Sequence, residues 1–156
     1  KIVIEKFTDA KLICCGTDKN NMLQKTVIEA RLKNNVETRG FVDYTNLPEL
    51  IRNCDIYVLS SLFESQNMSI LEAAFCGLPV VSTDVGLAKE IAQQIVPPGH
   101  YRALADKIIY VINNYDNESK IALDKIKLLR ENFSCEVTTE KYLKLYESLI
   151  DKNISG

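Results

Sequence analysis

Short apolar runs alternate with amphipathic segments along most of this sequence, and the alternation restricts the fold more than any other feature. The apolar runs are rich in Ile, Val, Leu and Cys, which is typical of buried strands, and the segments between them have helical spacing. Strands that alternate with helices in this way indicate βαβ units and a parallel sheet. The expected strands are 11–15, 36–42, 55–60, 79–83 and a short one at 95–96.

The expected helices follow from the same periodicity and from their end signals. Pro48 falls in a first helical turn, where its missing N–H costs nothing, and Gly77 and Pro79 mark the end of another helix. The predicted fold class is therefore α/β, with a Rossmann-like parallel sheet flanked by helices. The predicted helices are 20–33, 47–53, 69–76, 87–94, 101–114, 118–132 and 137–150. The apolar side chains expected to dock the last helix on the sheet are Tyr142, Leu143, Leu145, Tyr146 and Leu149.

Size and charge fit one domain and argue against several functional classes. The chain has 156 residues, with 19 basic and 21 acidic side chains, so its net charge is -2. This balance provides no basic patch for nucleic acid. No apolar run approaches the roughly 20 residues of a membrane span. Five cysteines without a CxxC spacing, and a single histidine, His100, argue against a metal site and indicate reduced, mostly core thiols in the cytoplasm.

The loop after the third expected strand has the residues best suited to bind a ligand. Ligands of parallel sheets bind outside the carboxyl ends of the strands, so the loops after Cys15, Val42, Ser60 and Thr83 are expected at one edge. Loop 60–69 leads into a helix, whose free N–H groups and dipole favour an anion. Asn67 or Ser69 is the candidate N-cap.

Two carboxylates accompany this helix end, and they allow two interpretations. Glu64 and Glu72 could accept hydrogen bonds from the hydroxyls of a sugar ester of a diphosphate. Alternatively, Glu72 serves only the helix end, in a loose capping box with Ser69, and Glu64 is a solvated loop residue.

The stretch 64–86 resembles the signature of retaining nucleotide-sugar glycosyltransferases with the GT-B fold, glycosyltransferase family 4 (glycosyl transferases group 1). Its mark is two glutamates separated by seven residues, here Glu64 and Glu72, followed by an Ala-x-x-Gly-x-Pro-Val-Val run that begins at Ala74. The likeness extends from about Lys11 to Ile150. It implies the C-terminal half of a GT-B fold, which binds the sugar donor.

The resemblance implies a role for each matching residue. Glu72 would bind the ribose hydroxyls of the nucleotide, and Glu64 would be the catalytic residue beside the donor sugar. The amides of Asn67, Met68 and Ser69 would hold the diphosphate. The residues that would surround the base are Gly16, Thr17, Gly40, Phe41 and Val42, with Leu47 or Leu50 packed under it. No metal and no other cofactor is expected, because protein cations serve the leaving group in this family.

The resemblance also implies what this chain lacks. Residues 1–156 are expected to form a single nucleotide-sugar-binding domain, truncated at its N-terminus inside the first helix at 1–7, without the acceptor-binding N-terminal domain. The family's diphosphate-binding Arg and Lys precede this point, so the isolated chain is expected to be inactive in transfer. Ser65-Gln66-Asn67 also replaces the family's more usual glycine-containing loop.

The implied activity is transfer of a hexosyl group, with retention of configuration, to a glycan or lipid-linked acceptor. The implied setting is surface polysaccharide or lipopolysaccharide biosynthesis in the bacterial cytoplasm, with the full-length protein at the inner face of the membrane. Alternatives are a sugar-nucleotide epimerase of the same fold and a non-catalytic Rossmann-like interaction domain. A dinucleotide-binding module is disfavoured because Gly16-Thr17 lacks the GxGxxG pattern, and a receiver domain because Asp18 stands alone after the first expected strand.

Overall fold

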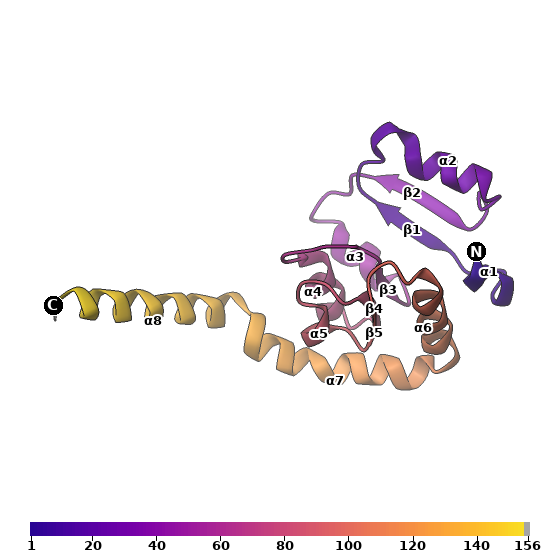
Figure 1. The fold of residues 1–156 in the computed structure, drawn as a ribbon. Coiled ribbons are helices and arrows are strands. Elements are labelled where there is room, and N and C mark those ends of the chain that lie inside the picture. The colour runs from indigo at the N-terminus through magenta and orange to yellow at the C-terminus, as the bar shows by residue number, and fades with distance from the viewer. Residues whose placement is uncertain (155–156) are drawn as a thin grey trace.

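The computed structural model describes residues 1–154 and the side chains of residues 1–150. Its strands and helices alternate as the sequence predicts (Figure 1). The strands are β1 Leu12–Cys15, β2 Val36–Gly40, β3 Tyr57–Leu59, β4 Val80–Thr83 and β5 Gln94–Val96. The helices are α1 Ile2–Lys6, η1 Lys19–Asn21, α2 Met22–Glu29, α3 Leu47–Arg52, α4 Met68–Phe75, α5 Ala88–Ile91, α6 Tyr101–Asn113, α7 Tyr115–Phe133 and α8 Cys135–Ile154.

The strands form two parallel sheets, where the sequence predicted one. β1 pairs with β2, and β3, β4 and β5 pair in that order. In Figure 1, β1 lies on the β3 side of β2, so that β1 and β3 are the neighbouring strands of the two sheets. The predicted α/β class, with parallel strands flanked by helices, is confirmed. The strands fall into two sheets because no strand of the described chain bonds to the second edge of β1 or of β3.

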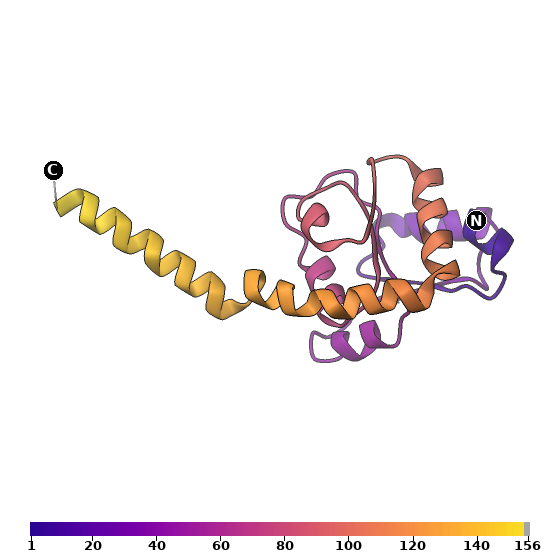
Figure 2. The same ribbon diagram turned by 90° about the horizontal axis from the view of Figure 1, so that it is seen from below.

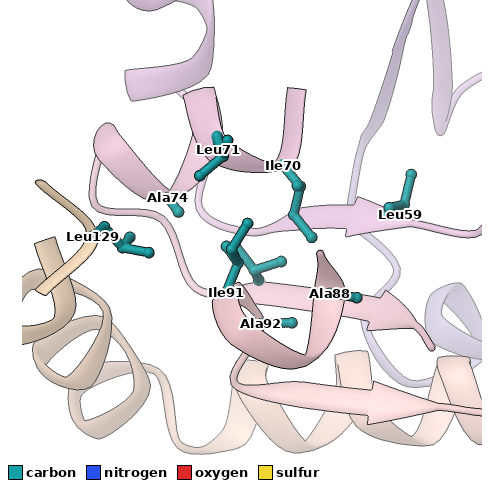
Figure 3. Packing of buried hydrophobic residues seen from close by; sticks show 9 residues of the cluster. Leu59, Ile70, Leu71, Ala74, Ala88, Ile91, Ala92 and Leu129 are labelled. Atoms are coloured by element: carbon teal, nitrogen blue, oxygen red, sulfur yellow. The ribbon is translucent and has the colours of Figure 1, made fainter. Parts of the chain in front are cut away.

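The main core lies where α4, α5 and α7 meet β3 and β4 (Figure 3). Ile70, Leu71 and Ile91 are buried there, and Leu129 of α7 reaches the same cluster. Burying a side chain of this size contributes roughly 1.5–3 kcal/mol. Every residue of β4 is buried, since α6 packs against this strand too, and both of its faces are therefore covered. The core thus fixes the position of α4 against β3.

Gly77 ends α4 as the sequence predicts. Its φ is +84°, and a Cβ built on it would lie 2.8 Å from Leu123 Cδ2. The left-handed backbone therefore favours glycine here, whereas the contact from α7 is with the end of the exposed Leu123 side chain, which can move aside.

The last helix does not dock on either sheet. Figures 1 and 2 show α8 projecting away from the body beyond the end of α7. The side chains predicted to cover the sheet are 48–56% exposed: Tyr142, Leu143, Leu145, Tyr146 and Leu149. That prediction was wrong, because an amphipathic pattern reveals which face seeks a partner but not where the partner lies.

The cysteines are also less buried than predicted. All five are free thiols, with Cys15 and Cys135 exposed and Cys14, Cys54 and Cys76 partly buried. Burial raises the pKa of the Cys14 thiol, and the nearby Cys15 acts in the same direction. Burial also raises the pKa of Cys54.

Candidate functional site

The loop between β3 and α4 folds back on itself around Glu64. The Glu64 side chain is partly buried, and its Oε1 accepts hydrogen bonds from Ser61 Oγ at 2.8 Å and from Asn67 Nδ2 at 3.2 Å. One carboxylate oxygen is thus held by two donors of its own loop. The sequence predicted Glu64 as a site residue but did not identify Ser61, although it stands only three residues before it.

Asn67 is the N-cap of α4, one of the two candidates from the sequence. Its backbone is extended, with φ −101° and ψ 111°, and its Oδ1 accepts hydrogen bonds from Ser69 N at 2.9 Å and Ser69 Oγ at 2.5 Å. Ser69 N, predicted as a free amide, is therefore occupied by Asn67 in this structure. Within the described chain the Met68 amide donates to no acceptor, so it remains available at the helix end.

Glu72 lies one turn further along α4 and does not take part in the cap. The loose capping box considered from the sequence is not formed, because Asn67 supplies the capping oxygen. The Glu72 side chain is partly buried, and no donor in the described part of the chain binds its carboxylate. Residues three and four apart share a helix face, so Glu72 follows Met68 and Ser69 on one side of α4. Its carboxylate is therefore free to accept hydrogen bonds from a ligand.

Tyr57 of β3 links the strand to this helix end. Its hydroxyl hydrogen-bonds Ser69 Oγ. Burial raises the pKa of the Tyr57 phenol, the hydrogen bond with Ser69 opposes that shift, and the charges of Glu72 and Glu64 add to it. Both glutamates therefore lie close enough to Tyr57 to act on it electrostatically. Tyr57 was not among the residues predicted for the site.

The end of β4 and the β4–α5 connection contact the loop between β3 and α4. Thr83, buried at the end of β4, donates from Oγ1 to the carbonyl of Ser61 at 2.7 Å. Gly86 has a φ of +50°, and a Cβ there would lie 3.2 Å from the Ser65 carbonyl and 3.5 Å from Glu64 Cβ. The strand ends of β3 and β4 thus meet at one edge, as expected for parallel neighbours.

The remaining predicted residues form a second group at the ends of β1 and β2. Gly16 N donates to Gly40 O at 2.6 Å, and both glycines have positive φ, +115° and +61°. Thr17 is exposed, as is Phe41 at 87%, so Phe41 is not part of a strand core. Among the described residues no hydrogen bond joins this group to Glu64 or Glu72.

A hollow of about 340 Å³ lies next to this second group. Val42 lines it, whereas Leu47, partly buried at the start of α3, does not. The other residues around the hollow are Ile13, Arg39, Asn46, Glu49, Leu50 and Asn53. Its volume lies at the lower end of the roughly 300–1,000 Å³ typical of ligand pockets.

Within the described chain, neither Glu64 nor Glu72 forms an ion pair with a lysine or arginine. The ion pairs there are Arg39 with Glu37 at 2.6 Å and Lys89 with Asp84 at 3.1 Å, and neither includes Glu64 or Glu72. The groups that the helix end itself offers to an anionic ligand are amide and hydroxyl groups. In the part of the chain that is described, no helix is long and apolar enough to cross a membrane. The same residues contain no cluster of His, Cys, Asp or Glu that could hold a metal ion.

Comparison with known sequences gives the family. The profile of the family "Glycosyl transferases group 1" matches residues 1–114. The chain therefore belongs to this family. A 2-deoxystreptamine N-acetyl-D-glucosaminyltransferase of Niallia circulans is 23% identical over 95% of the chain and 40% of its own length. The lipopolysaccharide core biosynthesis mannosyltransferase LpsB of Rhizobium meliloti is 26% identical over 78% of the chain and 39% of its own length.

Comparison with solved structures gives the fold. Anabaena HepE in complex with UDP and glucose superposes with a TM-score of 0.81 at 23% identity, over 94% of this chain and 44% of HepE. The C-terminal domain of a group 1 glycosyl transferase, LpcC from Francisella tularensis, gives a TM-score of 0.74 at 24% identity, over 86% of this chain and 75% of that domain. The fold is thus that of the C-terminal domain of a GT-B glycosyltransferase. The chain spans about two fifths of the length of the first curated relatives that it matches.

Proposed function

We propose that this chain binds the nucleotide-diphosphate sugar donor of a retaining hexosyltransferase. In this proposal Glu72 accepts from the ribose hydroxyls, Glu64 lies beside the sugar, and the start of α4 receives the diphosphate. The observation that carries it is the placement of Glu64 and Glu72 on either side of one capped helix start, with a free Met68 amide between them. Carboxylates accept the hydrogen bonds that sugar hydroxyls donate, and helix N-termini favour phosphate.

The diphosphate leaving group requires more than this chain offers. Donors aimed at the developing phosphate charge supply the main catalytic contribution in such a transfer. The resemblance to the family implies that an arginine and a lysine from a further segment complete the site, and neither ion pair of the described residues includes Glu64 or Glu72. The isolated chain is then a donor-binding unit, and residues 1–156 form a single domain of a larger enzyme.

We place the second group of residues beside the nucleotide base. The Gly16–Gly40 hydrogen bond keeps the two glycine turns together, and the exposed Phe41 ring is available to contact a flat base. In this proposal the base is also bordered by Thr17, Val42 and Leu47. The acceptor, a glycan or a lipid-linked sugar, would then be bound by a separate N-terminal domain. The name of the relative LpsB, a lipopolysaccharide core biosynthesis mannosyltransferase, supports a setting in surface polysaccharide synthesis. We place the full-length protein at the cytoplasmic face of the membrane.

Titration of the chain with nucleotides, followed by amide chemical shifts, tests the donor site. UDP, GDP, ADP, their hexose conjugates and NAD form the panel, and even millimolar binding, worth about 4 kcal/mol, is detectable. We expect shifts at residues 67–72 and 40–42, which disappear in Glu72→Gln. The control is Glu131→Gln, which changes an exposed carboxylate on α7 and should leave binding unchanged. Shifts confined to other regions, or produced by NAD alone, would contradict the proposal.

A further inference from the structure

The two oxygens of the Glu64 carboxylate have different surroundings. Oε1 accepts from Ser61 Oγ at 2.8 Å and from Asn67 Nδ2 at 3.2 Å. Oε2 accepts from no donor in the described part of the chain. An ionised carboxylate can accept about four hydrogen bonds, so Oε2 retains its full capacity.

The orientation of the Asn67 amide is determined by its other contacts. A backbone N–H can only donate, so the atom that faces Ser69 N must be the carbonyl oxygen Oδ1, at 2.9 Å. The NH₂ group must then face the other way, towards Glu64. The cap of α4 therefore sets the direction of the hydrogen bond that reaches the carboxylate.

The second donor is fixed independently of the helix. The Ser61 carbonyl accepts from the buried Thr83 Oγ1 at 2.7 Å, so the backbone that carries the Ser61 hydroxyl is tied to the end of β4. Glu64 is thus held from two sides, by α4 through Asn67 and by β4 through Ser61. Two titratable groups near this network are Tyr57 of β3 and Glu72 of α4.

We infer that Ser61 and Asn67 are positioning residues, which hold Glu64 by Oε1 and present Oε2 to a hydroxyl of the donor sugar. The inference rests on the proposed function for the identity of the ligand, but the holding of Oε1 does not depend on any ligand. It also assigns a role to Asn67, which belongs to the Ser65-Gln66-Asn67 segment that replaces the family's more usual glycine-containing loop.

Asn67→Asp keeps the contact of residue 67 with Ser69 N and removes its hydrogen bond to Glu64. Aspartate caps a helix as well as asparagine does, so the hydrogen bond from Ser69 N should be kept. The NH₂ donor is lost, and a second carboxylate faces Glu64. Ser61→Ala removes the other donor, and Ser61→Thr restores a hydroxyl as the conservative rescue.

The first measurement needs no ligand. We expect side-chain coupling constants and the carboxyl carbon shift to show one Glu64 rotamer in the wild type and in Ser61→Thr, and averaged rotamers in Asn67→Asp and Ser61→Ala. Ser69 amide protection should persist in Asn67→Asp, which excludes a general loss of the helix end. An unchanged single Glu64 rotamer in both donor-removing variants would overturn the inference.

The second measurement uses UDP and UDP-glucose as probes. Loss of one hydrogen bond to a charged group corresponds to about tenfold or more in affinity. We expect Ser61→Ala to weaken UDP-glucose by about that factor and to leave UDP unchanged, whereas Asn67→Asp should weaken both probes, because its new carboxylate lies at the helix start that receives the diphosphate. Equal weakening of both probes by Ser61→Ala would refute the role of Oε2 towards the sugar. Failure of the wild type to bind either probe would count against the donor site and against the use of Oε2, and the rotamer result would still decide whether Ser61 and Asn67 hold Glu64.

Discussion

Thr83 Oγ1 lies 2.7 Å from the carbonyl oxygen of Ser61 and donates a hydrogen bond to it, joining the end of β4 to the loop after β3. Both elements end at the same sheet edge, and the Thr83 side chain is buried beneath the loop. The loop that carries Glu64 is therefore anchored to the core of the domain, and the contacts around it can be tested by substitution.

Thr83→Val should destabilise the chain by roughly 1–3 kcal/mol, because it leaves the Ser61 carbonyl without its buried partner at nearly constant volume. Urea unfolding measures the loss. Thr138→Val on the exposed face of α8 is the matched control and should change little. Equal stability of the two variants would show that the anchor contributes nothing.

Tyr57→Phe should cost about 1 kcal/mol, because the hydroxyl bound to Ser69 is removed and the ring stays. It should also change the response to alkali. The folded-state pKa of Tyr57 is raised above the usual value of about 10, so its contribution is complete below that pH and is lost as the pH rises through the folded pKa. Unfolding free energies from about pH 9 upwards should therefore fall less steeply in the variant than in the wild type. Parallel curves would contradict this assignment.

Gly86→Ala should destabilise the chain more than Gly99→Ala. Both glycines have positive φ, so both variants pay a left-handed backbone penalty of roughly 1–2 kcal/mol. Only at Gly86 does the new Cβ meet backbone, the Ser65 carbonyl at 3.2 Å, whereas at Gly99 it meets the flexible Leu62 side chain at 3.9 Å. Chemical shifts of Glu64 and Ser65 should move more in Gly86→Ala than in Gly99→Ala, whose contact is with Leu62 of the same loop, and equal movement in both variants would argue against a local contact at Gly86.

Thiol labelling should proceed in two phases. The exposed Cys15 and Cys135 should react first, and Cys14 and Cys54 later, because burial raises the pKa of the latter two and lowers their thiolate fraction. Mass spectrometry of a time course identifies the sites, and the denatured chain, where all five should react alike, is the control. Early labelling of Cys54 would be inconsistent with its environment.

Local signals were enough to predict most of the fold. The α4 helix ends at Gly77 and β4 follows Pro79 because backbone conformation at these two residues is restricted by their own chemistry. Asn67 as N-cap was likewise one of two candidates from the sequence. The division into two sheets was not predicted, because pairing depends on which strands are neighbours and not on the composition of any one strand.

The candidate site was predicted only in part, for the same reason. Glu64 and Glu72 stand out by their spacing in the signature, but the contacts that hold Glu64 come partly from β4. The Thr83–Ser61 hydrogen bond spans 22 residues of sequence, and no periodicity indicates it. The occupied amide of Ser69 depends on a side-chain rotamer of Asn67, which a sequence pattern does not specify.

The division of the strands into two sheets also affects how the isolated chain behaves at high concentration. Each sheet leaves a row of backbone N–H and C=O groups without a strand partner in the described chain, on the side of β1 away from β2 and on the side of β3 away from β4. Such rows are templates for pairing with another polypeptide. Preparations should therefore associate edge to edge as concentration rises, and amide hydrogen exchange at Ile13 and Val58 should slow when they do. A polypeptide segment that paired with these edges would prevent the association and keep the domain monomeric.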